Sequence, residues 1–104
     1  MKPYIIVNPI AGAIVNRDVV LKQLRRLDPR KLSLTKRAGE AETLARAACH
    51  AGCEYIIAAG GDRTLHEVIN GIASPHLIRG VRLRIVPPGT ANDFARSMKL
   101  PARL

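Results

Sequence analysis

Short apolar runs alternate with helix-patterned segments along this chain, and this alternation restricts the possible folds more than any other feature. The run 55–59 (Tyr-Ile-Ile-Ala-Ala) is apolar throughout, which is typical of a strand buried on both faces of a sheet. The segment after it repeats apolar residues at helical spacing, on Leu65, Val68, Ile69 and Ile72. Because strands joined by helical crossovers run parallel and are covered by those helices, the pattern predicts a Rossmann-like α/β fold: a three-layer α/β/α sandwich with a mainly parallel sheet.

The same pattern extends over the whole chain. Strands are predicted at residues 4–7, 31–35, 55–59 and 81–86, and helices at about 16–27, 40–51, 64–73 and 91–98. Asp28-Pro29, Gly52 and Ser74-Pro75 are expected to end the first three helices. Ligands of open parallel sheets bind beyond the carboxyl ends of the strands, so we expect the functional site at that edge.

Composition sets limits on size and location. A chain of 104 residues predicts a single domain, and 47% apolar residues with only 3% aromatic ones predict an aliphatic, alanine-rich core. The apolar runs are far shorter than the ~20 residues of a membrane helix. The N-terminus lacks a secretory cleavage pattern, so a cytoplasmic protein is expected.

The strongest local signal is the sequence Gly60-Gly61-Asp62-Arg63-Thr64, directly after the apolar run 55–59. Glycines expose backbone amides, and a helix that starts at Thr64 would add unpaired donors with a favourable dipole, which suits a phosphate group; the alternative is a tight turn between strand and helix with no ligand. A carboxylate beside phosphates is repelled by them unless a cation lies between, so Asp62 suggests a Mg²⁺ ion held through water. The alternative is that Asp62 is a helix N-cap or an acidic residue in the first turn of the helix. Thr64 either donates to a phosphate or caps the helix.

A second loop, residues 87–93, follows the last predicted strand in the same way. Thr90 follows Gly89 at a predicted helix start and could donate to a phosphate, whereas Asn92 could brace the two loops; plain helix capping is the alternative for both. Asn8 and Thr35 end the first two predicted strands. All of these residues are expected at one edge of the sheet, where they would line a single nucleotide cleft.

The net charge of +9 favours a polyanionic partner: nucleotide phosphates, anionic lipid headgroups or nucleic acid. Basic residues cluster around one predicted helix end and the next strand, at Arg25, Arg26, Arg30, Lys31, Lys36 and Arg37. No aromatic residues are interleaved with them, which argues against a nucleic-acid partner because stacking platforms are missing.

The cysteine and histidine residues do not form a metal-binding pattern. Cys49 and Cys53 lack the usual C-x-x-C spacing and no second pair exists, so they are expected to be reduced thiols. His50, His66 and His76 are scattered along the chain.

Three motifs together resemble the diacylglycerol kinase catalytic domain family, with the bacterial soluble lipid kinases nearest and sphingosine and ceramide kinases further away. They are Val7-Asn8-Pro9 with Ala11-Gly12, Gly60-Gly61-Asp62-x-Thr64-Leu65-x-Glu67-Val68, and Pro88-Gly89-Thr90-Ala91-Asn92-Asp93-Phe94-Ala95-Arg96. The segment Thr35-x-x-x-Gly39-Glu40-Ala41 also fits the family pattern. The Gly-Gly-Asp loop alone is shared with NAD kinases and phosphofructokinases, so the segment 88–96 is the most specific of the motifs.

The resemblance implies a lipid kinase that uses ATP and Mg²⁺ to transfer the γ-phosphoryl group to a lipid hydroxyl, such as that of diacylglycerol. By position, it assigns ATP contacts to Asn8, Thr35, Gly60, Gly61, Asp62, Arg63, Thr64, Leu65, His66, Gly89, Thr90 and Asn92. Basic residues would add attraction to the inner membrane surface, about 1 kcal/mol each.

The chain departs from the family pattern in its glycine loop and in its length. Arg63 stands where the family has glycine, and His66 where asparagine is usual. If position 63 needs a positive φ or close approach of a phosphate, arginine would impair nucleotide binding; alternatively, its guanidinium reaches the phosphates and assists. Impaired or altered nucleotide binding is the favoured expectation, with tighter binding in an Arg63→Gly variant.

Family members continue into a β-rich domain that carries the lipid site and the catalytic base, so the chain corresponds to the nucleotide-binding half. Alone it is expected to be inactive, and its exposed interdomain surface could drive self-association. The alternatives are a catalytically inactive nucleotide- or anion-binding module and an NAD kinase-like domain.

Overall fold

The computed structural model of the protein describes residues 2–9, 17–76 and 80–86. In this part of the chain the elements are β1 (Tyr4–Val7), α1 (Arg17–Arg25), β2 (Lys31–Leu34), α2 (Glu40–His50), β3 (Tyr55–Ala59), α3 (Asp62–His76) and β4 (Arg82–Val86). The predicted helix at 91–98 lies outside the described residues.

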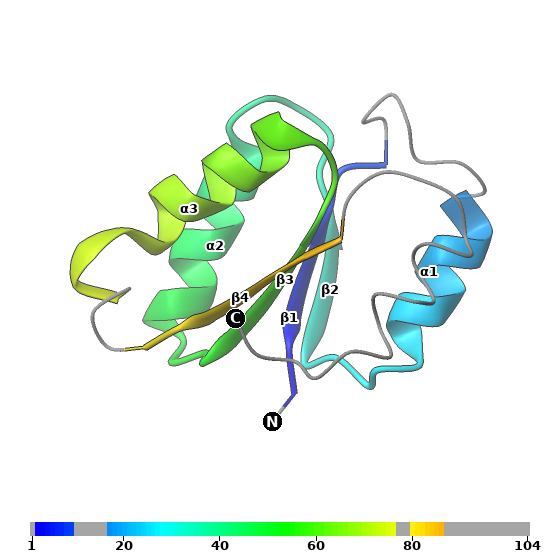
Figure 1. Ribbon diagram of the computed structural model, residues 1–104, viewed down its shortest axis with the longest axis horizontal. Helices are drawn as coiled ribbons and strands as arrows, with labels where there is room; N and C mark the ends of the chain where they lie inside the picture. Colours follow the sequence, from blue (N-terminus) through cyan, green and yellow to red (C-terminus); the bar gives the residue numbers. More distant parts are fainter. Residues whose placement is uncertain (1, 10–16, 77–79, 87–104) are drawn as a thin grey trace.

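All described strands form one parallel sheet in the order β2-β1-β3-β4. Helix α1 covers one face of the sheet, and α2 and α3 lie together on the other face (Figure 1). The predicted three-layer α/β/α sandwich is therefore confirmed. The strands β1 and β3 lie at the centre, which explains why their sequences are apolar without alternation.

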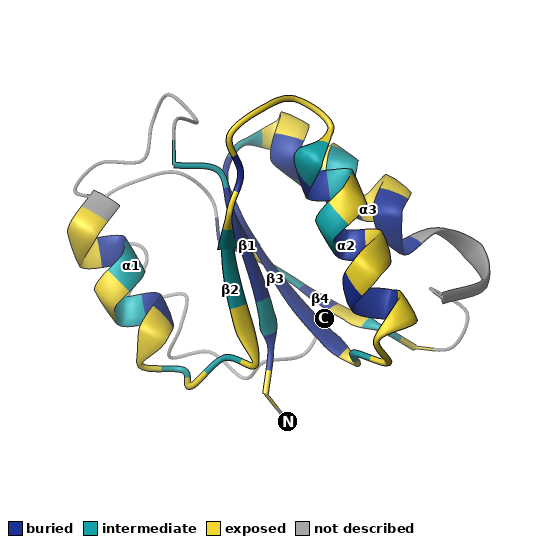
Figure 2. Cartoon of the chain, turned by 180° about the vertical axis from the view of Figure 1, so that it is seen from behind, coloured by how far each residue is buried: buried dark blue, intermediate teal, exposed yellow. Residues whose placement is uncertain are grey.

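The core consists of two clusters, one on each face of the sheet. Ile5, Val7, Ile57 and Ala59 point toward α1, where they contact Val20 and Leu24. The intervening strand residues point to the opposite face, toward α2 and α3. Figure 2 shows the central strands as the most deeply buried part of the molecule. Full burial of each large aliphatic side chain stabilises the fold by about 1.5–3 kcal/mol.

Small residues let α2 and α3 approach closely. Gly71 of α3 faces the backbone of α2: a Cβ on residue 71 would lie 2.3 Å from the carbonyl oxygen of Glu42 and 2.7 Å from the Cβ of Ala45. This contact explains why the α2 face of the core is built from alanines, at positions 41, 45 and 48.

Helix α3 differs from its predicted bounds of 64–73 at both ends. It begins at Asp62, because the carbonyl of Gly61 already accepts the first helical hydrogen bond, from the amide of Leu65 (3.1 Å). It ends at His76, so the prediction that Ser74-Pro75 stops it is wrong. Pro75 lies in the last turn, where the missing N–H removes a single bond of the helical ladder.

Gly52 terminates α2 as predicted, although the helix ends at His50, one residue before the predicted bound. Gly52 has φ +86°, its amide donates to the carbonyl of Cys49 (3.0 Å), and the amide of Cys53 donates to the carbonyl of Ala48 (3.0 Å). This is a Schellman motif, in which only glycine adopts the left-handed conformation without strain.

Candidate functional site

The carboxyl ends of the strands form a continuous row. The amide of Thr35 donates to the carbonyl of Val7 (2.8 Å), and the amide of Asn8 donates to that of Ala59 (2.9 Å). The amide of Gly60 donates to the carbonyl of Val86 (3.2 Å). The hydrogen-bonded ladder thus extends one residue beyond β1, β2 and β3. Thr35, Asn8 and Gly60 consequently lie side by side, with ~4.8 Å between neighbouring strands.

Helix α3 starts directly at this row. Gly61 is its N-cap residue, and the amides of Asp62, Arg63 and Thr64 follow in the first turn, where a helix offers no internal acceptor. These donors and the positive end of the helix dipole favour an anion at this point. A Cβ on residue 61 would have no atom of the described residues within 4 Å.

Thr64 lies inside the first turn of α3, so the predicted helix start at this residue is wrong. Its side chain is 2% exposed and lies against Gly60. Thr35, at the end of β2, is 5% exposed. Two buried threonines therefore stand at the same edge as the α3 amides, and a threonine hydroxyl can donate one hydrogen bond.

Asp62 is the exposed first residue of α3, which corresponds to the first-turn alternative for this carboxylate. A negative charge there interacts favourably with the helix dipole. The described part of the chain holds no group of three or more side chains arranged to bind a metal ion. Any role of Asp62 toward Mg²⁺ is therefore a proposal, taken up below.

Arg63 has an ordinary helical backbone, because it is not among the residues with positive φ. The strain considered from the sequence is therefore not present. Its side chain is 74% exposed and runs along the helix to Glu67, where Nε lies 3.5 Å from Oε2. Leu65 packs against the α2/α3 side of the core, and His66 is exposed.

The basic residues grouped together in the sequence separate into two places. Arg25, Arg26, Arg30 and Lys31 lie near the amino edge of the sheet, around the end of α1 and the start of β2. Lys36 and Arg37 come after β2, at the carboxyl edge, and both are exposed. The two groups stand ~16 Å apart along β2, given a rise of ~3.3 Å per residue.

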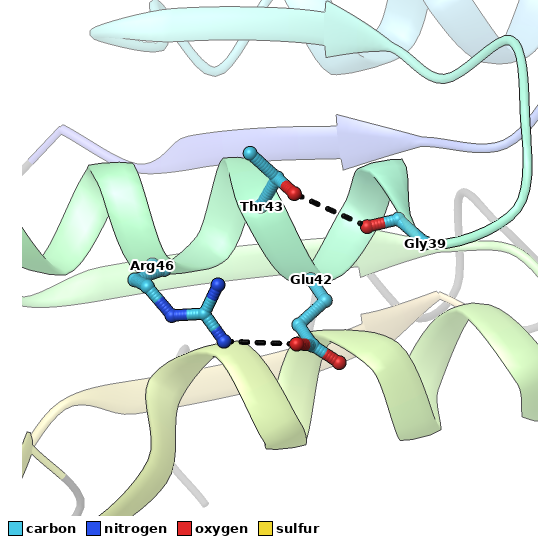
Figure 3. A network of polar contacts seen from close by, with 4 residues as sticks. All are labelled: Gly39, Glu42, Thr43 and Arg46. Atoms are coloured by element: carbon cyan, nitrogen blue, oxygen red, sulfur yellow. Dashed lines mark hydrogen bonds and ion pairs between the residues drawn. The ribbon is translucent and has the colours of Figure 1, made fainter.

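Sequence reasoning did not assign Lys36 and Arg37 to the site, although their position just after a predicted strand was the available signal. A tight loop holds them there. Gly39, with φ +84°, is the N-cap of α2, and the carboxylate of Glu40 accepts a hydrogen bond from the amide of Lys36. Thr43 strengthens the same turn with a hydrogen bond from Oγ1 to the carbonyl of Gly39 (3.4 Å; Figure 3).

Residues 87–93 lie outside the described residues, and with them the predicted contacts Gly89, Thr90 and Asn92. The structure shows where this segment begins. Strand β4 ends at Val86, which is paired with Ala59 and accepts a hydrogen bond from the amide of Gly60 (3.2 Å).

The comparison with known families agrees with this geometry. The model of the diacylglycerol kinase catalytic domain matches residues 2–104. The chain belongs to the diacylglycerol kinase catalytic domain family. The resemblance read from the three sequence motifs is thereby confirmed.

The chain is similar in sequence to several diacylglycerol kinases. The one from Staphylococcus haemolyticus is 40% identical over 102 residues, which cover 94% of this chain and 30% of the relative. The one from Staphylococcus saprophyticus is 39% identical over 101 residues, which cover 93% of this chain and 32% of the relative. A crystal structure of a diacylglycerol kinase from Bacillus anthracis superposes with a TM-score of 0.67 at 31% identity, covering 96% of this chain and 37% of that one.

The chain spans about a third of the length of the relatives that it matches. Within its described residues, no helix combines the length and the apolar character required to cross a bilayer.

Proposed function

We propose that this chain is the ATP-binding part of a lipid kinase, which transfers the γ-phosphoryl group of ATP to a lipid hydroxyl such as that of diacylglycerol. The observation that carries the proposal is the row Thr35–Asn8–Gly60 beside the open amino end of α3. Family membership supports ATP as the ligand.

In this proposal the phosphates bind where backbone donors are concentrated. The amides of residues 61–64 hold phosphate oxygens, and the buried hydroxyls of Thr35 and Thr64 donate to them. Asn8 lies next in the row, and Gly89, Thr90 and Asn92 are proposed as further ATP contacts. Phosphoryl transfer depends mainly on such positioning and on charge neutralisation. Mg²⁺ would neutralise phosphate charge, and Asp62 would hold it through water.

The lipid acceptor requires a further part of the protein. The relatives are about three times as long as this chain, and we assign the lipid site and the general base to the portion beyond it. The chain alone is therefore expected to bind ATP without transferring its phosphoryl group.

A cytoplasmic location at the inner membrane face completes the proposal. The exposed residues Lys22, Arg25, Arg26, Arg30 and Lys31 form a basic surface at the amino edge of the sheet. Cations near an anionic membrane contribute about 1 kcal/mol each. Sedimentation with phosphatidylglycerol vesicles, but not with phosphatidylcholine vesicles, is expected; equal sedimentation with both would contradict membrane binding through this surface.

We also expect the chain to self-associate. A monomer in light scattering at high protein concentration would contradict this expectation.

Calorimetry with Mg-ATP, ADP and NAD tests the nucleotide site. Thr64→Val removes the buried hydroxyl and keeps the shape of the side chain, so it should weaken Mg-ATP binding by about tenfold without loss of stability. Thr43→Val, which removes a hydroxyl bonded within α2, is the matched control and should bind like the wild type. Preferential binding of NAD would favour an NAD kinase-like domain, and the absence of binding to any nucleotide would refute the proposal.

The role of Asp62 needs its own variant. If the carboxylate holds Mg²⁺, Asp62→Asn should make ATP binding insensitive to Mg²⁺. If the carboxylate only stabilises the helix, the variant should lose about 0.3–1 kcal/mol of stability and keep its response to Mg²⁺.

A further inference from the structure

The Arg63 guanidinium is placed unfavourably in the absence of a ligand. It belongs to the first turn of α3, where the helix dipole is positive and acidic residues are preferred. It is 74% exposed, and its contact in the described structure is the carboxylate of Glu67, with Nε 3.5 Å from Oε2. A cation kept at the positive end of a helix suggests that an anion is the missing partner.

The ion pair that holds Arg63 is weak. In a helix, a pair of this spacing is more favourable when the acidic residue comes first, and here the basic residue comes first. Helix α2 provides the contrast: Glu42 precedes Arg46, and their charged atoms lie 2.8 Å apart (Figure 3). The Arg63 side chain is 74% exposed, whereas that of Glu67 is 17% exposed, and the 3.5 Å contact is longer than a charge-assisted hydrogen bond, so the guanidinium is free to exchange this partner for a better one.

We propose that Arg63 is a phosphate-binding residue, held along α3 by Glu67 and transferred to the terminal phosphates when a nucleotide occupies the amino end of the helix. This inference rests on the function proposed above. The helical backbone of Arg63 removes the steric strain that would argue against it. A guanidinium matches phosphate oxygens with two parallel hydrogen bonds, which the 3.5 Å contact to Glu67 does not provide.

The neighbouring residues fit this role. Thr64 is buried with its hydroxyl at the same turn, and Asp62 is exposed beside Arg63, so the first turn presents a donor, a carboxylate and a cation. The carboxylate repels phosphate, and the guanidinium offsets that repulsion directly. Arg63 should therefore matter most for the β- and γ-phosphates, where the negative charge is greatest.

Calorimetry on Arg63→Gln and Arg46→Gln tests the inference. Both variants remove one positive charge and one pair spaced four residues apart, and Arg46 lies on α2, away from the amino end of α3. We expect Arg63→Gln to weaken Mg-ATP binding about tenfold and to leave AMP binding unchanged, whereas Arg46→Gln binds both like the wild type. The affinity of Arg63→Lys for Mg-ATP should fall between those of the wild type and Arg63→Gln, because lysine keeps the positive charge but cannot donate two parallel hydrogen bonds as a guanidinium does.

The outcomes separate this inference from the proposed function. If the wild type and Arg63→Gln bind Mg-ATP equally, or Arg63→Gln binds it more tightly, the role of Arg63 is refuted and the nucleotide site stands. If Arg46→Gln weakens binding as much as Arg63→Gln, general charge explains the effect and the inference again fails. If the folded wild type binds no nucleotide, both the inference and the proposed function fail. Circular dichroism of each variant establishes that it is folded.

Discussion

Thr64 fills the space in which a side chain of Gly60 would stand. A Cβ on residue 60 would lie 2.6 Å from the Thr64 hydroxyl oxygen and 2.8 Å from the Thr64 Cβ. The contact fixes the end of β3 against the first turn of α3. The two glycines of the loop therefore differ: Gly60 is required for packing, whereas Gly61 leaves the helix start open.

Gly60→Ala should destabilise the chain by about 1–3 kcal/mol, because the buried, β-branched Thr64 cannot move aside without shifting the helix. Urea unfolding measures the loss. Gly61→Ser is the matched control: it adds a side chain where nothing lies within 4 Å and keeps a residue suited to an N-cap, so its stability should stay near that of the wild type. Equal destabilisation by the two variants would contradict the distinction between the glycines.

Gly71→Ala should be more damaging still. The added Cβ would meet backbone of α2, at 2.3 Å from the Glu42 carbonyl oxygen, so the helices must separate and lose their close contact. We expect a loss of about 2–3 kcal/mol in urea unfolding, even though alanine favours helix formation. Asn70→Ala, at the exposed neighbouring position, should be neutral or slightly stabilising; a neutral Gly71→Ala would show that α2 and α3 are not packed this closely.

The fold followed from the sequence because its strands and helices have distinct periodicities. The buried strands β1 and β3 and the apolar stripe of α3 needed no tertiary information. The start of α3 could not be located in the same way, because Gly61 acts as N-cap through its backbone and leaves no side-chain signal. The close approach of α2 and α3 at Gly71 could not be predicted from the sequence either, because it depends on which residues of α2 lie opposite Gly71.

For the candidate site, the sequence predicted which edge of the sheet would carry it, but not how its side chains would be arranged. Glycine turns after parallel strands indicated where donors would gather, but the sequence could not show that the Thr64 hydroxyl is buried against Gly60. Arg63 suggested strain from its residue type alone, and only the backbone conformation settles that point. Lys36 and Arg37 were grouped with distant cations because sequence proximity ignores the length of the intervening strand.

Glu40 should order the loop that follows Thr35. Its carboxylate accepts a hydrogen bond from the amide of Lys36, so Glu40→Ala should cost about 1 kcal/mol and speed hydrogen exchange at that amide. Glu40→Gln keeps an acceptor oxygen and should show a smaller effect on both. Unchanged exchange at Lys36 in Glu40→Ala would show that the loop is held by other contacts.

Cys53 should make stability depend on pH under alkaline conditions. Burial, followed by the charge of the neighbouring Cys49 thiol, raises the pKa of Cys53 from 9.0 to about 11. The folded state thus holds this proton more tightly than the unfolded state, and the resulting stability is complete below pH 9 and lost as pH rises toward 11. Urea unfolding across this range should show the decline, and Cys53→Ala should reduce its slope. A residual slope is expected in that variant, because burial also raises the pKa of Tyr55 and of Cys49. Identical slopes in Cys53→Ala and wild type would mean that the Cys53 thiol is as accessible in the folded chain as in the unfolded one.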